Sequence, residues 1–129
     1  MPPRGRPFGD DKMIKIEAVV RPERVNVVLE AMVEAGCQGY SYHNVTGRGQ
    51  QQGVVVFTGR GGHVMSRASV PKTIISAVVK DDQKEAVIEA IIASARSGED
   101  GAIGDGKIFV SPVTEVVRVR TGERDQAAL

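Results

Sequence analysis

The sequence predicts a small α+β domain in which two strand–helix–strand halves build one antiparallel sheet. Alternating and helical patterns of apolar residues succeed one another twice along the chain. The length of 129 residues corresponds to a single domain, since domains commonly contain about 100–150 residues. Hydrophobic residues make up 41% and charged residues 26%, which is typical of a globular protein. Aromatic residues reach only 4%, so the core must be mainly aliphatic.

The first half follows a polar, proline-rich segment, residues 1–12, for which we expect a flexible extension. Residues 13–20 then alternate apolar and charged side chains, which predicts a strand with one face on a core. Arg21-Pro22 ends this strand. Apolar residues at helical spacing over 25–35 predict a helix that ends at Gly36.

Two further strands are predicted on either side of a long loop. Residues 40–46 and 70–80 are rich in β-branched side chains, and the former also in aromatic ones, which favours strands. The segment between them, residues 47–69, is glycine-rich and unusually long for a simple connection.

The second half ends with a helix and two strands. An acidic start at 81–85, with Asp81-Asp82 three residues before Glu85, predicts the cap of a helix whose apolar stripe continues to Ala95. Residues 108–110 predict a fourth strand, and alternation over 115–120 predicts a short final strand. The order β-α-β-β-α-β is that of the ferredoxin-like fold, a four-stranded antiparallel sheet with both helices on one face.

The uncovered face of this sheet predicts self-association. It would carry Met13, Lys15, Glu17 and Val19 as well as arginines of the final strand, a mixture of apolar and charged groups. Association of subunits stabilises such a face better than water does, so we expect a homo-oligomer.

Charge and cysteine content exclude several classes of protein. Seventeen Lys and Arg residues against 16 Asp and Glu residues give a net charge of +1, without the footprint of a nucleic-acid binder. A single cysteine, Cys37, excludes an intramolecular disulfide and fits a reducing cytoplasm. A membrane-spanning helix needs about 20 consecutive apolar residues, and no apolar run in the sequence approaches that length. We therefore expect a cytoplasmic protein without membrane insertion or nucleic-acid partner.

Three segments are suited to an anion. Glycines in residues 47–53 let successive N–H groups face one anion, although a plain hairpin is the alternative. Residues 101–107 combine glycines with a lysine, and Asp105 could instead fix the turn. Arg118 and Arg120 would point to the same side of the predicted final strand, as a fork for a polyphosphate or a carboxylate, or simply as a solvated face.

Catalytic residues are not recognisable in this sequence. The only histidines are His43 and His63, and their spacing from Cys37 is not typical of a metal site. No serine or cysteine stands in a nucleophile-elbow motif. The sequence favours binding over catalysis, and we expect no enzyme activity.

Two C-terminal motifs closely resemble the signatures of the PII signal-transduction family. They are GDGKIFV at 104–110 and VRVRTGE at 117–123, and the resemblance extends over 13–129. It implies a homotrimer of ferredoxin-like subunits that binds ATP or ADP in the clefts between subunits, with 2-oxoglutarate held beside the triphosphate through Mg²⁺. It also implies three functional loops: a T-loop at about 48–70 that docks on targets, a B-loop at about 97–107 that holds phosphates, and a C-terminal loop at 121–129.

The resemblance also implies the ligand contacts. The nucleotide-binding residues would be Val19, Ser41, Gly47, Gly49, Gln50, Gln51, Val78, Gly104, Asp105, Gly106, Lys107, Arg118 and Arg120. The two arginines would come from the neighbouring subunit. Gln51 would bind Mg²⁺ when ATP is present, and Gln51 and Lys72 would hold 2-oxoglutarate or another small anion.

The sequence departs from the family pattern in the T-loop and the B-loop. Gln50 and Gln52 stand where family members usually carry basic residues, and the loop apex lacks the tyrosine that is uridylylated in many members. The B-loop is longer than usual and adds the carboxylates of Glu99 and Asp100.

We therefore expect a PII-type sensor that controls a nitrogen-related target through its T-loop: an ammonium transporter, an enzyme or a regulator. The alternative, favoured by the missing basic residues, is a divergent sensor of ADP or AMP with another small anion, such as bicarbonate, that serves carbon or anion transport. A metal-binding trimer similar to the CutA proteins would share the fold but would not need GDGK or the arginine pair.

Overall fold

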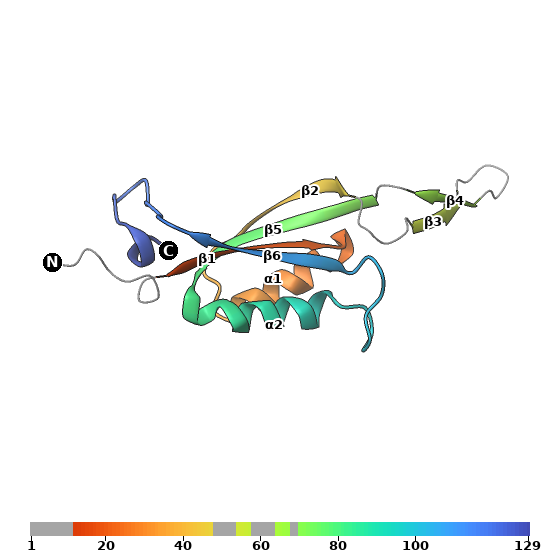
Figure 1. Ribbon diagram of the computed structural model, residues 1–129, viewed down its shortest axis with the longest axis horizontal. Coiled ribbons are helices and arrows are strands. Elements are labelled where there is room, and N and C mark those ends of the chain that lie inside the picture. The colour runs from red at the N-terminus through yellow and green to blue at the C-terminus, as the bar shows by residue number, and fades with distance from the viewer. Residues whose placement is uncertain (1–11, 48–53, 58–63, 68–69) are drawn as a thin grey trace.

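The computed structural model describes residues 12–47, 54–57, 64–67 and 70–129. Its main sheet has four antiparallel strands in the order β2-β5-β1-β6, and both helices cover one face (Figure 1). The strands are β1 (Met13–Val20), β2 (Ser41–Gly47), β5 (Val70–Lys80) and β6 (Gly106–Val113), and the helices are α1 (Val25–Glu34) and α2 (Lys84–Ala95). This arrangement confirms the predicted ferredoxin-like fold.

The core lies between the sheet and the two helices. Alternate residues of β1 and β5 point into the core. The hydrophobic ones among them are buried because they pack on the apolar stripes of α1 and α2. The core residues from these four elements are Ile14, Ile16, Ala18, Val20, Val25, Val28, Leu29, Met32, Ile75, Ala77, Val79, Val87, Ile91 and Ala95. Within the described ranges, neither helix is long and apolar enough to cross a membrane.

Both helices begin with a single 3₁₀ turn. Pro22–Arg24 precedes α1, and Gly36, with φ +107°, follows its end as predicted. Asp81–Gln83 precedes α2, and the Gln83 side chain accepts a hydrogen bond from the Lys80 N–H at 3.1 Å. The predicted acidic cap with Glu85 is therefore wrong, because the 3₁₀ turn moves the capping position to Gln83.

A second, two-stranded sheet lies inside the segment predicted as the T-loop. Strands β3 (Val54–Phe57) and β4 (Val64–Arg67) pair in antiparallel register, from Val54 with Arg67 to Phe57 with Val64. In Figure 1 this hairpin lies beyond the ends of β2 and β5. The run of β-branched residues at 54–57 was the signal for it, and our sequence analysis did not use that signal.

The predicted final strand at 115–120 is wrong. The fourth strand of the sheet instead extends through Val113, and among the described residues the following segment has only an isolated bridge between Val117 and Arg124. A turn closes this segment on itself, because Gly122 adopts φ +73° and donates its N–H to the Arg118 carbonyl at 2.8 Å. A last 3₁₀ turn, Asp125–Ala128, ends the chain.

The sheet face without helices, called the open face below, carries both charged and apolar side chains as predicted, but Met13 on it is buried. Lys15, Glu17 and Val19 are partly exposed, but Met13 is 2% exposed although it does not belong to the core cluster. The C-terminal segment lies beside it, since the Gln126 amide donates to the Lys12 carbonyl at 3.3 Å. Phe109 on β6 remains 54% exposed.

Glycine is required at position 106. The residue has φ +132°, and a Cβ there would lie 2.0 Å from the Val19 carbonyl oxygen. We expect Gly106→Ala to lower the free energy of unfolding by at least about 3 kcal/mol, because a main-chain clash adds to backbone strain. Gly98→Ala is the matched control: Gly98 also has a left-handed φ, +67°, but faces open space, so about 1 kcal/mol is expected. Urea denaturation measures both values, and equal losses would contradict this explanation.

Candidate anion-binding site

The loop between α2 and β6 is organised around the carboxylate of Asp105. Oδ2 accepts the N–H groups of Ser97 and Ala102, both at 2.8 Å. Oδ1 accepts the Ser97 hydroxyl at 2.6 Å and Arg21 Nε at 3.1 Å. The Asp105 N–H itself donates to the Ala102 carbonyl at 3.1 Å. The polar groups of Asp105 are thus used within the chain, which favours the turn-fixing role over ligand contact.

These contacts keep Asp105 ionised. Burial alone would raise the pKa of its carboxyl, but the hydrogen bonds from Ser97, Ala102 and Arg21 outweigh burial and hold the pKa far below its usual range. The negative charge is therefore permanent at physiological pH, and it compensates part of the positive charge nearby.

Two arginines on the turn between β1 and α1 hold the two ends of this loop. Arg21 Nη2 donates to the Ile103 carbonyl at 2.9 Å, in addition to the contact with Asp105. Arg24 Nε donates to the Ser94 carbonyl at 3.0 Å, near the end of α2, where a cation also interacts favourably with the helix dipole. Our sequence analysis did not assign Arg21 to the site. The signal in the sequence was its place directly after β1, in the run Val20-Arg21-Pro22.

Lys72 brings a second cation to the same loop. Its ammonium group donates to the Gly104 carbonyl. A Cβ at Gly104 would lie 3.3 Å from Arg21 Nη2 and 3.7 Å from Lys72 Nζ, so both cations converge on this glycine. Burial and the charge of Arg21 lower the pKa of Lys72, while Asp105 and Glu23 oppose that shift.

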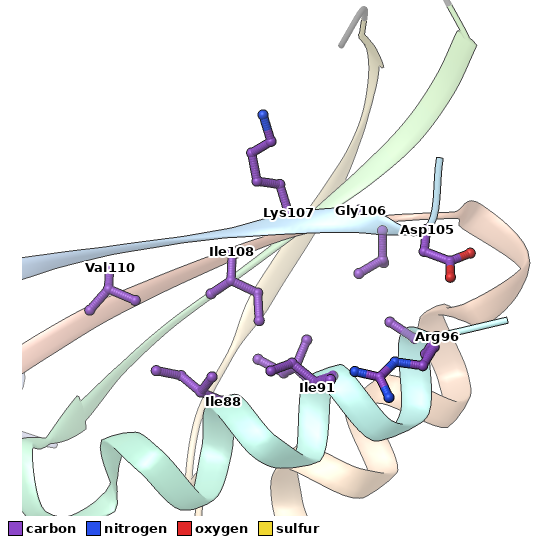
Figure 2. A pocket seen from close by; sticks show the side chains of 11 residues that line it. Ile88, Ile91, Arg96, Asp105, Gly106, Lys107, Ile108 and Val110 are labelled. Atoms are coloured by element: carbon purple, nitrogen blue, oxygen red, sulfur yellow. The ribbon is translucent and has the colours of Figure 1, made fainter. Parts of the chain in front are cut away.

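Lys107 adds a third cation at the same end of the open face. Strand alternation places Lys72 and Lys107 on this face, since their neighbours Thr73 and Ile108 face the helices. Lys107 pairs with Val19 in the β1–β6 ladder, and Figure 2 shows its side chain pointing away from α2. We call Arg21, Lys72 and Lys107 the cation cluster. Together with the loop glycines, it can bind an anion with several charges.

The residues predicted to contact the nucleoside also share the open face. Val19 lies between Ile74 and Lys107, Ser41 is opposite Ser76, and Val78 is opposite Lys15. Gly47 is the last residue of β2. The other predicted contacts on this loop, Gly49, Gln50 and Gln51, lie outside the described residues, as does the Gln51 position expected to bind Mg²⁺.

The predicted arginine fork depended on a strand at 115–120 that the structure does not have. Arg118 donates to Glu123 Oε1 at 3.3 Å and to the Leu129 carbonyl at 3.0 Å, while Arg120 lies in the turn that follows. They are not on a strand, so alternation does not align them. In Figure 1 the C-terminal segment and the α2–β6 loop lie at opposite ends of β6, a strand of eight residues that spans roughly 25 Å. One chain cannot bring these arginines to Lys107.

Metal ligands are not clustered in the part of the chain that the structure describes. No group of three or more His, Cys, Asp or Glu side chains there could hold an ion. Cys37 is a buried free thiol whose pKa is raised by burial, and it donates to the Gly39 carbonyl.

Comparison with known families identifies the chain. The family model described as nitrogen regulatory protein P-II matches residues 13–123. The chain belongs to the P-II (PII) family. This confirms the resemblance of the two C-terminal motifs. Because the family consists of signalling regulators, it also confirms the expectation of a regulator and not an enzyme.

PII proteins from distant organisms are similar to this chain. A P-II homolog of Arabidopsis thaliana is 46% identical over 119 residues, which are 92% of this chain and 59% of that protein. The nitrogen regulatory protein P-II 2 of Methanothermobacter thermautotrophicus is 43% identical over 118 residues, 91% of this chain and 97% of that protein. The chain therefore spans little more than half of the plant relative and nearly all of the archaeal one.

Solved PII structures share the fold. Arabidopsis thaliana PII bound to citrate has a TM-score of 0.70 and 41% identity, with 95% of this chain and 97% of that chain covered. The ATP complex of B. subtilis GlnK has a TM-score of 0.72 and 26% identity, with 93% of this chain and all of that chain covered.

Asp105 predicts a specific dependence of stability on pH. We expect Asp105→Asn to lower the free energy of unfolding at pH 7 by about 2 kcal/mol, since hydrogen bonds to a charged group contribute about 1.5–3 kcal/mol and this loop is partly open to solvent. The folded pKa is lowered. The stabilisation is therefore present above the unfolded pKa of about 3.9 and is lost as pH falls toward the folded pKa.

Urea denaturation at pH 7 and pH 3 tests this dependence. The difference between wild type and Asp105→Asn should shrink at pH 3. Asp82→Asn, on the exposed 3₁₀ turn before α2, is the control and should change little at either pH. A difference that is equal at both pH values would contradict the stabilisation of the ionised form.

Proposed function

We propose that this PII protein binds an adenine nucleotide, ATP or ADP, between the subunits of a homotrimer. One observation supports this most: the glycine loop with Lys107 and the pair Arg118 and Arg120 lie at opposite ends of the same subunit. A site that uses both is complete only when a second copy supplies the arginines. A ring of three copies repeats such a contact and closes it.

The chemistry of the cation cluster fits a polyphosphate. Glycines at 104 and 106 with positive φ angles bring the main chain close to a ligand, and Lys107 projects from the strand that follows. Lys72 is held by the Gly104 carbonyl in this chain, so an anion there would replace that contact. The ATP complex of the B. subtilis relative supports nucleotide as the ligand class.

A second anion beside the nucleotide is part of the proposal. Lys72 and Arg21 converge on Gly104 and would hold a carboxylate such as that of 2-oxoglutarate. Citrate in the Arabidopsis structure supports a carboxylate ligand for the family. Asp105 is fully hydrogen-bonded and offers no free oxygen to a cation, so Mg²⁺ would depend on the phosphates and Gln51.

The signalling output would be a change in the T-loop. Lys72 lies two residues after Val70, where β5 leaves that loop, so an anion that displaces Lys72 from Gly104 acts at the base of the T-loop. We propose a nitrogen-related protein target in the cytoplasm: an ammonium transporter, an enzyme or a regulator.

Gln50 and Gln52 favour the second candidate, a sensor of ADP or AMP with an anion such as bicarbonate. Two glutamines in place of basic residues reduce the positive charge available to a γ-phosphate. Calorimetric titration separates the two candidates. ATP, ADP and AMP are each titrated in the presence of 2-oxoglutarate with Mg²⁺ and, separately, in the presence of bicarbonate. Enhancement by 2-oxoglutarate with ATP supports the first, and enhancement by bicarbonate with ADP or AMP supports the second.

The assembly can be measured directly. We expect light scattering of the purified protein at micromolar concentration to give three times the chain mass of 13.8 kDa. The physical reason is that the open face and the divided site both require neighbouring copies. A monomer or dimer mass would overturn the site between subunits.

Lys107 tests the nucleotide site. Lys107→Ala should weaken ADP binding about tenfold to a hundredfold, because a charge-assisted contact to phosphate is lost. Lys84→Ala, at the start of α2 on the helix-covered side of the sheet, is the control and should leave the affinity unchanged. Isothermal titration calorimetry measures both variants. Equal affinity of Lys107→Ala and wild type would place the nucleotide elsewhere.

A further inference from the structure

A groove lies on the side of β6 that faces away from the open face. It lies between β6 and α2, with a volume of about 430 Å³, within the range of about 300–1,000 Å³ of small-molecule pockets. Strand alternation separates the groove from the open face: Lys107 points to the open face, whereas Ile108 and Val110 point toward α2 (Figure 2). Gly106 and Lys107 also border the groove, but the side chain of Lys107 extends to the open face and leaves the aliphatic wall to α2 and the other side of β6.

The walls of the groove are aliphatic. Ile88 and Ile91 of α2 face Ile108 and Val110 of β6, and Ile92 also lines the groove. Ile88 and Ile108 are only partly buried, and Val110 is 45% exposed. Such aliphatic surface favours an apolar chain that removes it from water.

Arg96 places one cation at the end of this groove. It directly follows α2, and Figure 2 shows its guanidinium group turned toward the groove near Ile91. The stem of Arg96 is held, since a Cβ at Gly101 would lie 3.2 Å from Arg96 Cγ. Its hydrogen-bond contact is with the Glu99 carbonyl at 3.5 Å, which is at the limit of a hydrogen bond. The guanidinium is therefore available to a ligand.

Among the described residues, Asp105 is the only carboxylate that lines the groove, and it does not neutralise Arg96. Asp105 is satisfied by Ser97, Ala102 and Arg21. An aliphatic groove with one available guanidinium at its end is complementary to a molecule with an apolar chain and one carboxylate, because the planar guanidinium accepts a carboxylate in a bidentate manner. We propose that this groove binds an aliphatic carboxylate, with its chain along the isoleucines and its carboxylate on Arg96.

Octanoate is the probe for this site. In the full-length protein with labelled isoleucine methyl groups, titration with octanoate should shift the signals of Ile88, Ile91, Ile92 and Ile108. The signals of Ile14 and Ile75, in the core over β1 and β5, should stay unchanged. Acetate, which lacks the chain, should cause no shift at the same concentration.

Arg96 supplies the decisive variant. Arg96→Gln should weaken octanoate at least about tenfold and leave the weaker binding of octanol unchanged. Lys84→Gln, at the other end of α2, is the matched control and should bind octanoate like wild type. Because Arg96 is exposed, its replacement should not alter the unfolding temperature.

Four results would overturn the proposal, and the first three concern octanoate. They are equal octanoate affinity in Arg96→Gln and wild type, no methyl shift up to millimolar octanoate, and shifts that spread to Ile14 and Ile75. If a second copy fills the groove, the same methyl signals shift on dilution without octanoate, and that result also overturns it. None of these outcomes depends on nucleotide binding, so failure of the octanoate proposal would leave the proposed nucleotide binding untouched.

Discussion

The ion pair between Arg21 and Asp105 joins parts of the chain that are 84 residues apart, and the geometry of the site depends on it. The side chains remain 30% and 17% exposed, so Coulomb attraction alone would contribute little. Its strength comes from the hydrogen bonds around Asp105, which fix the loop from Ser97 to Gly106 in one shape. Gly104 and Lys107 acquire their positions as a consequence.

The sheet separates two kinds of chemistry by its alternation. Residues of β6 that point to the open face carry the cation of the proposed nucleotide site, and those that point to α2 carry the apolar wall of the groove. Both sites end at the same loop. The two proposed sites therefore lie on opposite sides of β6, although Asp105, Gly106 and Lys107 of the loop border both.

The sequence predicted the sheet and helices well where one face of an element is buried. Strands β1 and β5 bury every second residue, so their apolar periodicity follows directly from packing. The same alternation at 115–120 misled the analysis, because a strand also needs a partner with free hydrogen-bonding groups, and this segment turns back at Gly122. Periodicity in one segment carries no information on what lies beside it.

The site was predicted less completely than the fold. Lys72, Gly104 and Lys107 stand in motifs that the sequence shows, whereas Arg21 acquires its role only because the loop around Asp105 comes to it in space. The strand expected to align Arg118 and Arg120 was wrong because spacing along the sequence does not fix the path of the main chain between them.

The loop between α2 and β6 is closed on itself at the Asp105 carboxylate. Ser97 and Ala102, which stand on either side of residues 98–101, both donate to the same carboxylate oxygen of Asp105. Residues 98–101 therefore form a small loop whose two ends are fixed at the Asp105 carboxylate, and Glu99 and Asp100 in it are exposed to solvent. A change in residues 98–101 would therefore alter the exposed surface of the loop while the residues of the proposed anion site stay in place.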